Sequence, residues 1–154
     1  MKNAGAFAAL KILHTALLAG QILFMAVLIY LSYSKTITPA LPEQDKIFQL
    51  IAIAISAAAF FIGTKIFKKK LLEIRDDNES DVKAKFDKYR AASIVQWALI
   101  EGASLFCCFC FFLVGNFAFL ALAAVLIILF GLLAPVKLKA ALQMGVSVDE
   151  LSSL

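Results

Sequence analysis

Apolar residues along this chain gather into four long runs that charged residues rarely interrupt. The runs occupy residues 12–33, 47–67, 91–114 and 117–134. An α-helix needs about 20 consecutive apolar residues to cross the hydrocarbon core of a bilayer, and each run is close to that length. The pattern predicts an all-α membrane protein in which four transmembrane helices form an antiparallel bundle, with residues 1–154 as a single membrane domain.

The connections between the runs differ in character. Pro39 and Pro42 lie between the first two runs, where they disfavour a helix and predict an irregular loop. Only Gly115 and Asn116 separate the last two runs, which leaves room for a tight turn. Pro135 follows the fourth run and predicts the end of its helix.

Residues 68–90 hold most of the charged side chains and predict a helical cytoplasmic hairpin between the second and third spans. Lys69 with Glu73, and Asp81 with Lys85, are opposite charges four residues apart, the spacing of ion pairs on a helix surface. The hairpin is either a solvated structural element or a docking surface for a partner protein or for anionic lipid headgroups.

A turn is predicted within the hairpin at residues 76–80, because this polar run interrupts the apolar periodicity and supplies capping side chains. Beyond it, Phe86 and Tyr89 lie on one helical face. We expect these rings to meet Leu71 and Ile74 across the hairpin.

The C-terminal tail, residues 136–154, is predicted to lie in the cytoplasm. Ser147 and Glu150 have the spacing of a capping box, in which each residue bonds the backbone N–H of the other. This spacing predicts a short surface helix near the end of the tail.

Composition supports the membrane assignment. Hydrophobic residues make up 62% of the chain, charged residues 17%, and the mean hydropathy is +0.90. A soluble domain is roughly half apolar. The net charge of +4 does not indicate nucleic-acid binding, since no basic patch carries interleaved aromatic residues. We expect the lipid bilayer as a partner, and no nucleic acid.

The distribution of positive charge predicts the orientation. With both termini and residues 65–90 inside, 13 of the 15 Lys and Arg residues face the cytoplasm, and only Lys35 and Lys46 lie outside. The opposite orientation reverses this ratio. The sequence therefore predicts a multi-pass protein of the cell (inner or plasma) membrane with cytoplasmic N- and C-termini.

One carboxylate, Glu101, lies near the middle of the third run. At about 1.5 Å per residue it sits roughly 15 Å from Ala91, close to the bilayer midplane. Gln21 and Ser56 are predicted at the same depth on the first and second spans. An ionised carboxylate there costs from roughly 3 to more than 10 kcal/mol unless it is hydrogen-bonded or neutralised. We expect Glu101 to face the bundle interior and to bond Gln21.

The helical face around Glu101 is mixed in character. Trp97, Ser104 and Cys108 fall within about 60° of it at 100° per residue. Trp97 is too deep for an interfacial ring, and we expect it to shield the carboxylate from cytoplasmic water. A carboxyl group shielded from water holds its proton more readily, which is what a proton carrier requires.

Small residues predict close helix packing at two places. Ala59 and Gly63 stand four residues apart on the second span, and Gly102 and Ala103 directly follow Glu101 on the third. Small side chains let a neighbouring helix backbone approach closely inside a membrane.

His14 is the single histidine of the chain and lies on roughly one helical face with Lys11 and Gln21. It is either a pH-sensitive station between the cytoplasm and the midplane or an interfacial side chain. Haem ligation by two histidines is excluded, because there is no second one.

Residue sets that carry catalysis are missing. The sequence has no Ser/His/Asp set, no paired carboxylates within a span and no Gly-rich phosphate loop. Cys107, Cys108 and Cys110 lack the spacing of a zinc site and are predicted to be small buried apolar residues. We therefore expect a protein that is not an enzyme, with no metal and no cofactor.

A central helix glutamate in a four-span chain of this length resembles the proteolipid subunits of rotary ATPases. This chain departs from their pattern, since its first run has a single glycine and the acid lies in the third span, not the last. The resemblance covers Glu101 and the number of spans only.

Two functions follow from these residues. The first is an oligomeric subunit or channel linked to protons or cations, whose site would hold Glu101, Gln21, Ser104, Ser56 and His14. The alternative is a non-catalytic scaffold that binds a partner through the cytoplasmic hairpin, with Glu101 as a hydrogen-bonded link between helices. Either fits a homo-oligomer or a subunit of a membrane complex.

Overall fold

The computed structural model describes residues 5–36, 38–77 and 80–152. This part of the chain folds into α-helices joined by short connections, without a β-strand. The elements in chain order are α1 (Ala6–Tyr33), the 3-10 helix η1 (Pro42–Gln44), α2 (Asp45–Asp76), α3 (Val82–Val114), α4 (Ala118–Leu132), α5 (Lys137–Met144) and α6 (Val148–Ser152).

Three helices, α1, α2 and α3, are each long and apolar enough to cross a membrane. The predicted fourth span, residues 117–134, is shorter than expected: α4 has 15 residues, about 22 Å, against a hydrocarbon core of about 30 Å. Pro135 explains the early end, because it disfavours the helical conformation of Ala134 and has no N–H to donate. The chain then bends by 72° into α5, and the two helices together satisfy the criteria for a fourth span.

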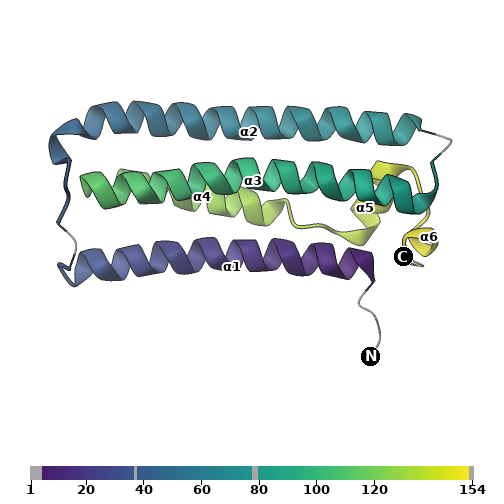
Figure 1. Cartoon of the computed structure of the whole chain (residues 1–154), viewed down its shortest axis with the longest axis horizontal. Helices are drawn as coiled ribbons and strands as arrows, with labels where there is room; N and C mark the ends of the chain where they lie inside the picture. Colours follow the sequence, from purple (N-terminus) through teal and green to yellow (C-terminus); the bar gives the residue numbers. More distant parts are fainter. Residues whose placement is uncertain (1–4, 37, 78–79, 153–154) are drawn as a thin grey trace.

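Helix α3 is the centre of the arrangement (Figure 1). It packs against α2 and α4 and, along a narrower seam, against α1. In Figure 1, α1 and α2 lie on either side of α3, and α4 lies behind it. Helices α1 and α3 run in one direction, and α2 and α4 run in the other. The connection from α2 to α3 lies at the same end as the N-terminus, α5 and α6, and we call this the hairpin end.

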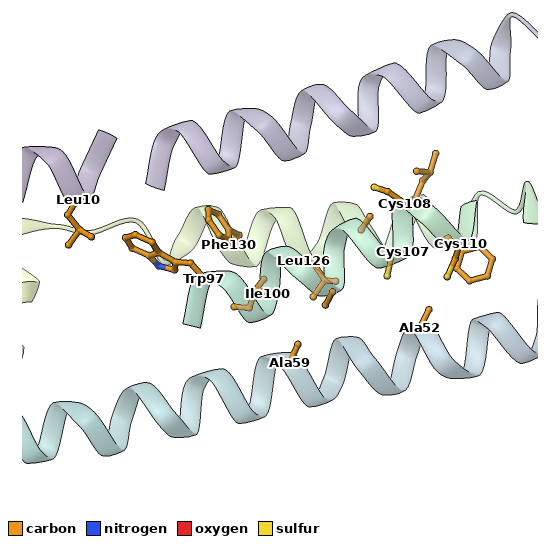
Figure 2. Packing of buried hydrophobic residues seen from close by; sticks show 14 of the residues in the cluster. Leu10, Ala52, Ala59, Trp97, Ile100, Cys107, Cys108, Cys110, Leu126 and Phe130 are labelled. Atoms are coloured by element: carbon orange, nitrogen blue, oxygen red, sulfur yellow. The ribbon is translucent and has the colours of Figure 1, made fainter. Parts of the chain in front are cut away.

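A stripe of small residues on α2 faces α3. Its members are buried and recur every three or four residues: Ala52, Ser56, Ala59 and Gly63. A Cβ atom on Gly63 would lie 3.6 Å from the backbone oxygen of Gln96, so the two backbones are already close. Ala52 and Ala59 point toward α3 in Figure 2. The structure places Ala59 and Gly63 at this close approach of α2 to α3.

Helix α1 is buried along one narrow line only. Its buried residues, Leu10, His14, Gln21 and Leu28, recur at intervals of four or seven. The remaining surface carries exposed large apolar side chains such as Leu23 at 66% and Ile12 at 63%. Apolar side chains this exposed suit contact with lipid, in agreement with a membrane protein.

At the hairpin end, α2 and α3 continue past the predicted spans and pack on each other. Ile74 and Phe86 are each 1% exposed, and the rings of Phe67 and Tyr89 lie 5.9 Å apart. Ile74, Phe86 and Tyr89 thus belong to one buried cluster, against which Leu71 packs, and the ring contact of Tyr89 is with Phe67. Asn78 and Glu79, at the predicted turn, lie outside the described residues.

The ion pairs of this segment differ from those predicted. Glu73 accepts a hydrogen bond from Lys70 at 2.6 Å instead of Lys69, and this contact lowers the pKa of the Glu73 carboxyl. Asp81 accepts from the backbone N–H of Ala84 at 2.7 Å, so it caps α3 and does not pair with Lys85. The cause is the free N–H groups at a helix start, which an Asp at the N-cap satisfies.

The tail packs onto this end of the bundle (Figure 1). Leu151 of α6 and Met144 of α5 are almost completely buried. The predicted capping box is formed, since Ser147 N donates to Glu150 Oε2 at 2.7 Å and Glu150 N donates to Ser147 Oγ at 3.1 Å. The bond from Ser147 N, together with a hydrogen bond from the Ser147 side chain to the carboxylate, lowers the pKa of the Glu150 carboxyl.

At the other end, the turn between α3 and α4 is tied to the loop before α2. Asn116 donates to both carboxylate oxygens of Asp45, at 3.0 and 2.9 Å. Gly115 caps α3 in a left-handed conformation, with φ of 78°, directly beneath Pro39. A Cβ atom on Gly115 would lie 2.5 Å from Pro39 Cγ, so the turn requires glycine.

We predict that Gly115→Ala lowers the free energy of unfolding by about 1–3 kcal/mol, because alanine is strained at this φ and its Cβ collides with Pro39. Thermal unfolding in detergent measures this as a lower Tm. Gly20→Ala is the control: Gly20 is helical and a Cβ there meets nothing within 4 Å, so its Tm should be unchanged or higher. Equal Tm values for the two variants would contradict the prediction.

Candidate functional site

Glu101 lies on α3 at the border between its buried and its uncovered surface, and its side chain is partly exposed. Its neighbours Trp97, Ile100 and Ser104 are buried at 2% or less. The uncovered surface, called here the open face of α3, consists of exposed residues three or four apart: Val95, Ala98, Gly102, Leu105, Phe109 and Phe112. The predicted interior position of Glu101 is therefore only half correct.

The carboxylate of Glu101 forms no hydrogen bond or ion pair with any residue that the structure describes. The predicted bond from Gln21 is absent, since both Gln21 side-chain polar atoms, Nε2 and Oε1, are buried without a partner. Gln21 is 1% exposed, so it belongs to the core as predicted, but it does not reach Glu101.

The register of α1 on α3 explains the missing bond. His14 contacts Trp97, with ring centres 4.7 Å apart, and the two helices run in the same direction. Seven residues further along each helix, Gln21 is level with Ser104, about 4.5 Å beyond Glu101. Ser104 is fully buried and its Oγ also lacks a partner.

Ser56 lies further still from Glu101. Its hydroxyl donates to the backbone oxygen of Ala52 at 2.7 Å and contacts the Cys107 sulfur at 3.5 Å. Cys107 is six residues past Glu101, about 9 Å along α3. Glu101, Gln21 and Ser56 are therefore staggered along the bundle and do not share one depth.

His14 belongs to an aromatic cluster that joins α1, α3 and α4. It stacks on Phe130 with ring centres 4.6 Å apart and meets the edge of Trp97. Its Nε2 lies 3.0 Å from the backbone oxygen of Phe130, in the last turn of α4, and this oxygen also accepts from Leu133 N at 3.0 Å. His14 is 2% exposed, whereas Lys11 is exposed, so the predicted common face of Lys11 and His14 is not observed.

The small residues beside Glu101 play different parts. Ala103 is 2% exposed and packs in the core, as predicted. Gly102 is exposed, and a Cβ atom on it would meet nothing within 4 Å, so the predicted close helix contact at Gly102 is absent within one chain. The structure therefore leaves open space beside Gly102, the residue that follows Glu101.

The three cysteines are free thiols buried in α3, as predicted. Cys107 points toward α2, and Cys108 points to the opposite side of the helix (Figure 2). In the described part of the chain, no group of three or more His, Cys, Asp or Glu side chains is placed to hold a metal ion.

The open face of α3 is the feature that sequence reasoning missed. The sequence contains a weak indication of this face, because Ala98, Gly102 and Leu105 have the spacing of residues on one side of a helix. Neighbouring faces of α3 are equally apolar, so hydropathy did not distinguish the uncovered side. No protein family, curated protein or solved structure matches the chain. Its function is therefore argued from these residues alone.

We predict that Gln21→Leu raises the free energy of unfolding by about 1–3 kcal/mol, because it removes two buried polar atoms that have no partner. Thermal unfolding in detergent measures the change. Gln49→Leu is the matched control, since Gln49 donates to Asp45 at 3.0 Å and should lose stability. A lower Tm for Gln21→Leu would mean that the Gln21 amide is satisfied in the membrane.

Proposed function

We propose that this protein is a subunit of a homo-oligomer in the cell membrane, with Glu101 at the contact between copies in a proton- or cation-binding site. One observation carries the proposal: the carboxylate of Glu101 lies midway along a span, beside an apolar open face, without a partner among the described residues. Exposure of a carboxylate to lipid is unfavourable in free energy. A second copy of the chain packed on the open face would shield the carboxylate from lipid. The proposed role is non-catalytic and needs no cofactor.

The open face has the features of a helix contact between membrane proteins. Ala98 and Gly102 are four residues apart, the spacing at which small residues allow two helices to approach closely. Within residues 5–36, 38–77 and 80–152, no atom lies within 4 Å of a Cβ built on Gly102. Leu105 and Phe109, exposed at 36% and 52%, extend the contact surface beyond the small residues.

A two-fold axis along the membrane normal would bring the Glu101 side chains of two copies near each other. Two carboxyl groups at close range cannot both ionise readily, so one holds a proton or the pair shares a cation. This pairing supplies the second carboxylate that a single chain lacks. His14, Gln21, Ser56 and Ser104 then support the helix positions and do not form the ion site.

The proposal includes the predicted orientation. The hairpin end, with both termini, faces the cytoplasm, and α4 with the residues up to Ala134 makes the fourth crossing. Its support is the asymmetry of positive charge, since only Lys35 and Lys46 lie near the other end of the bundle.

We predict that Gly102→Cys forms a disulfide-linked or short-reagent-linked dimer in native membranes, because Gly102 lies at the centre of the proposed contact. The parent should remain uncrosslinked, since its three cysteines are buried. Leu23→Cys, exposed at 66% on α1 but away from α3, is the matched control and should not crosslink. Equal crosslinking at both positions, or none at Gly102, would remove the proposed interface.

We predict that the parent protein in liposomes conducts protons or a monovalent cation, and that Glu101→Gln abolishes this flux while the dimer persists, because glutamine cannot ionise. Glu43→Gln, an exposed position in η1, makes the same exchange elsewhere and should conduct normally. A parent that forms the dimer but shows no flux at any pH would leave Glu101 a structural contact only.

The alternative function, a scaffold that binds a partner through the hairpin, has its own supporting observation. Helices α2 and α3 extend about two turns beyond the predicted spans and remain packed by Ile74 and Phe86. A stiff charged projection of this kind suits protein docking. Deletion of residues 76–80 tests it, because binding of a partner should fail while the Gly102→Cys dimer still forms.

A further inference from the structure

Two adjoining clefts lie at the hairpin end between α2 and the tail. The first has a volume of about 310 Å³ and is lined by Lys68, Leu71, Leu72, Arg75 and Gln143. The second has a volume of about 390 Å³ and is lined by Arg75, Val136, Leu138, Lys139, Leu142 and Gln143. Arg75 and Gln143 line both clefts, so the two form one continuous surface.

We propose that these clefts bind the phosphate headgroup of an anionic phospholipid, which Lys68, Arg75 and Lys139 hold by charge. All three side chains are exposed. None of them forms a salt bridge with a described residue, whereas the nearby Lys70 and Lys88 do. Three cations without carboxylate partners around one cleft favour an anion, and Arg75 offers a planar fork that matches two phosphate oxygens.

The apolar part of the clefts favours a lipid over a free anion. Leu72, Leu138 and Leu142 are 62%, 60% and 69% exposed beside the cations. A free phosphate ion leaves these side chains uncovered, whereas the acyl chains of a phospholipid cover them. Charged and apolar side chains therefore share one surface, as a ligand with both a charged headgroup and acyl chains requires.

The site lies at the depth of headgroups. Lys68 directly follows the apolar run of α2, and Arg75 stands two turns further, about 10 Å along the helix. Helix α5 leaves α4 at 72° and buries Ala140 and Met144 against the bundle, while its other side remains exposed. Its geometry is that of an amphipathic helix lying along the membrane surface.

Two of the lining side chains are held in place. A Cβ atom on Gly145 would lie 3.8 Å from Arg75 Cγ, so the Arg75 stem rests against the end of α5. The Tyr89 hydroxyl donates to Gln143 Oε1 at 3.4 Å, which leaves the amide N–H₂ of Gln143 to donate to a phosphate oxygen. Burial raises the pKa of the Tyr89 hydroxyl, so it keeps its proton at neutral pH.

The test uses the full-length protein in detergent, with bound phosphatidylglycerol counted by native mass spectrometry and phosphatidylcholine as the neutral lipid. We expect the double variant Arg75→Gln/Lys139→Gln to bind phosphatidylglycerol about tenfold more weakly than the parent, since each basic residue near the surface contributes to anionic-lipid binding. Phosphatidylcholine should bind weakly to both proteins.

The matched control is Lys69→Gln/Lys83→Gln, which removes the same charge from exposed positions at the same end, outside the clefts. It should bind phosphatidylglycerol like the parent. If both double variants lost the same amount of phosphatidylglycerol binding, the lipid would be attracted by the net charge of the protein alone. That result would overturn the proposed site. Displacement of the lipid by millimolar inorganic phosphate would assign the clefts to a free anion instead.

A lower Tm of Arg75→Gln/Lys139→Gln would mean that its weaker lipid binding could come from misfolding. The single variant Arg75→Lys separates the two effects. This variant keeps the charge but loses the planar fork, so it should fold like the parent and bind phosphatidylglycerol with intermediate strength. Binding equal to that of the parent in both Arg75 variants would overturn the proposal. The outcome does not depend on Glu101, so the two proposals fail or survive separately.

Discussion

Close packing of α2 on α3 through small side chains is the constraint on which the other helices depend. Ala52, Ser56, Ala59 and Gly63 remove bulk from one side of α2, so the α3 backbone lies close to it. With α4 packed on another side and α1 touching along a narrow line, α3 has one face left without cover. The position of Glu101 beside that face is therefore a consequence of how the bundle packs.

Polar side chains inside the bundle fall into two groups. Those of one group contact a backbone carbonyl oxygen at hydrogen-bond distance, and those of the other have no hydrogen-bond partner. The hydroxyl of Ser56 bonds the preceding turn of its own helix, and His14 reaches a carbonyl at the end of α4. The side-chain polar atoms of Gln21 and Ser104 are buried without a hydrogen-bond partner among the described residues. Glu101 is not buried in this way, because it lies at the border of the open face of α3, where a second protein chain can contact its carboxylate.

The break after α4 links the membrane part of the fold to its charged end. Pro135 stops the helix and turns the chain across the end of the bundle, so that α5 meets α2 near Arg75. Residues 60 or more positions apart in sequence thereby form one basic and apolar surface. The same bend leaves α4 short, so three helices are long and apolar enough to cross a membrane singly, and α4 is a candidate span only when it is counted together with α5.

The sequence by itself determined the helices, the tight turn at Gly115, the capping box of Ser147 and Glu150, and the packing of Ala59 and Gly63, because each depends on local chemistry or on small size. It also identified Glu101 as unusual. Only the tertiary structure decided that Gln21 lies level with Ser104, that Gly102 faces open space and that Arg75 and Lys139 line one cleft. The physical reason is that hydropathy is nearly uniform around an apolar helix, so packing alone selects its buried face and its register.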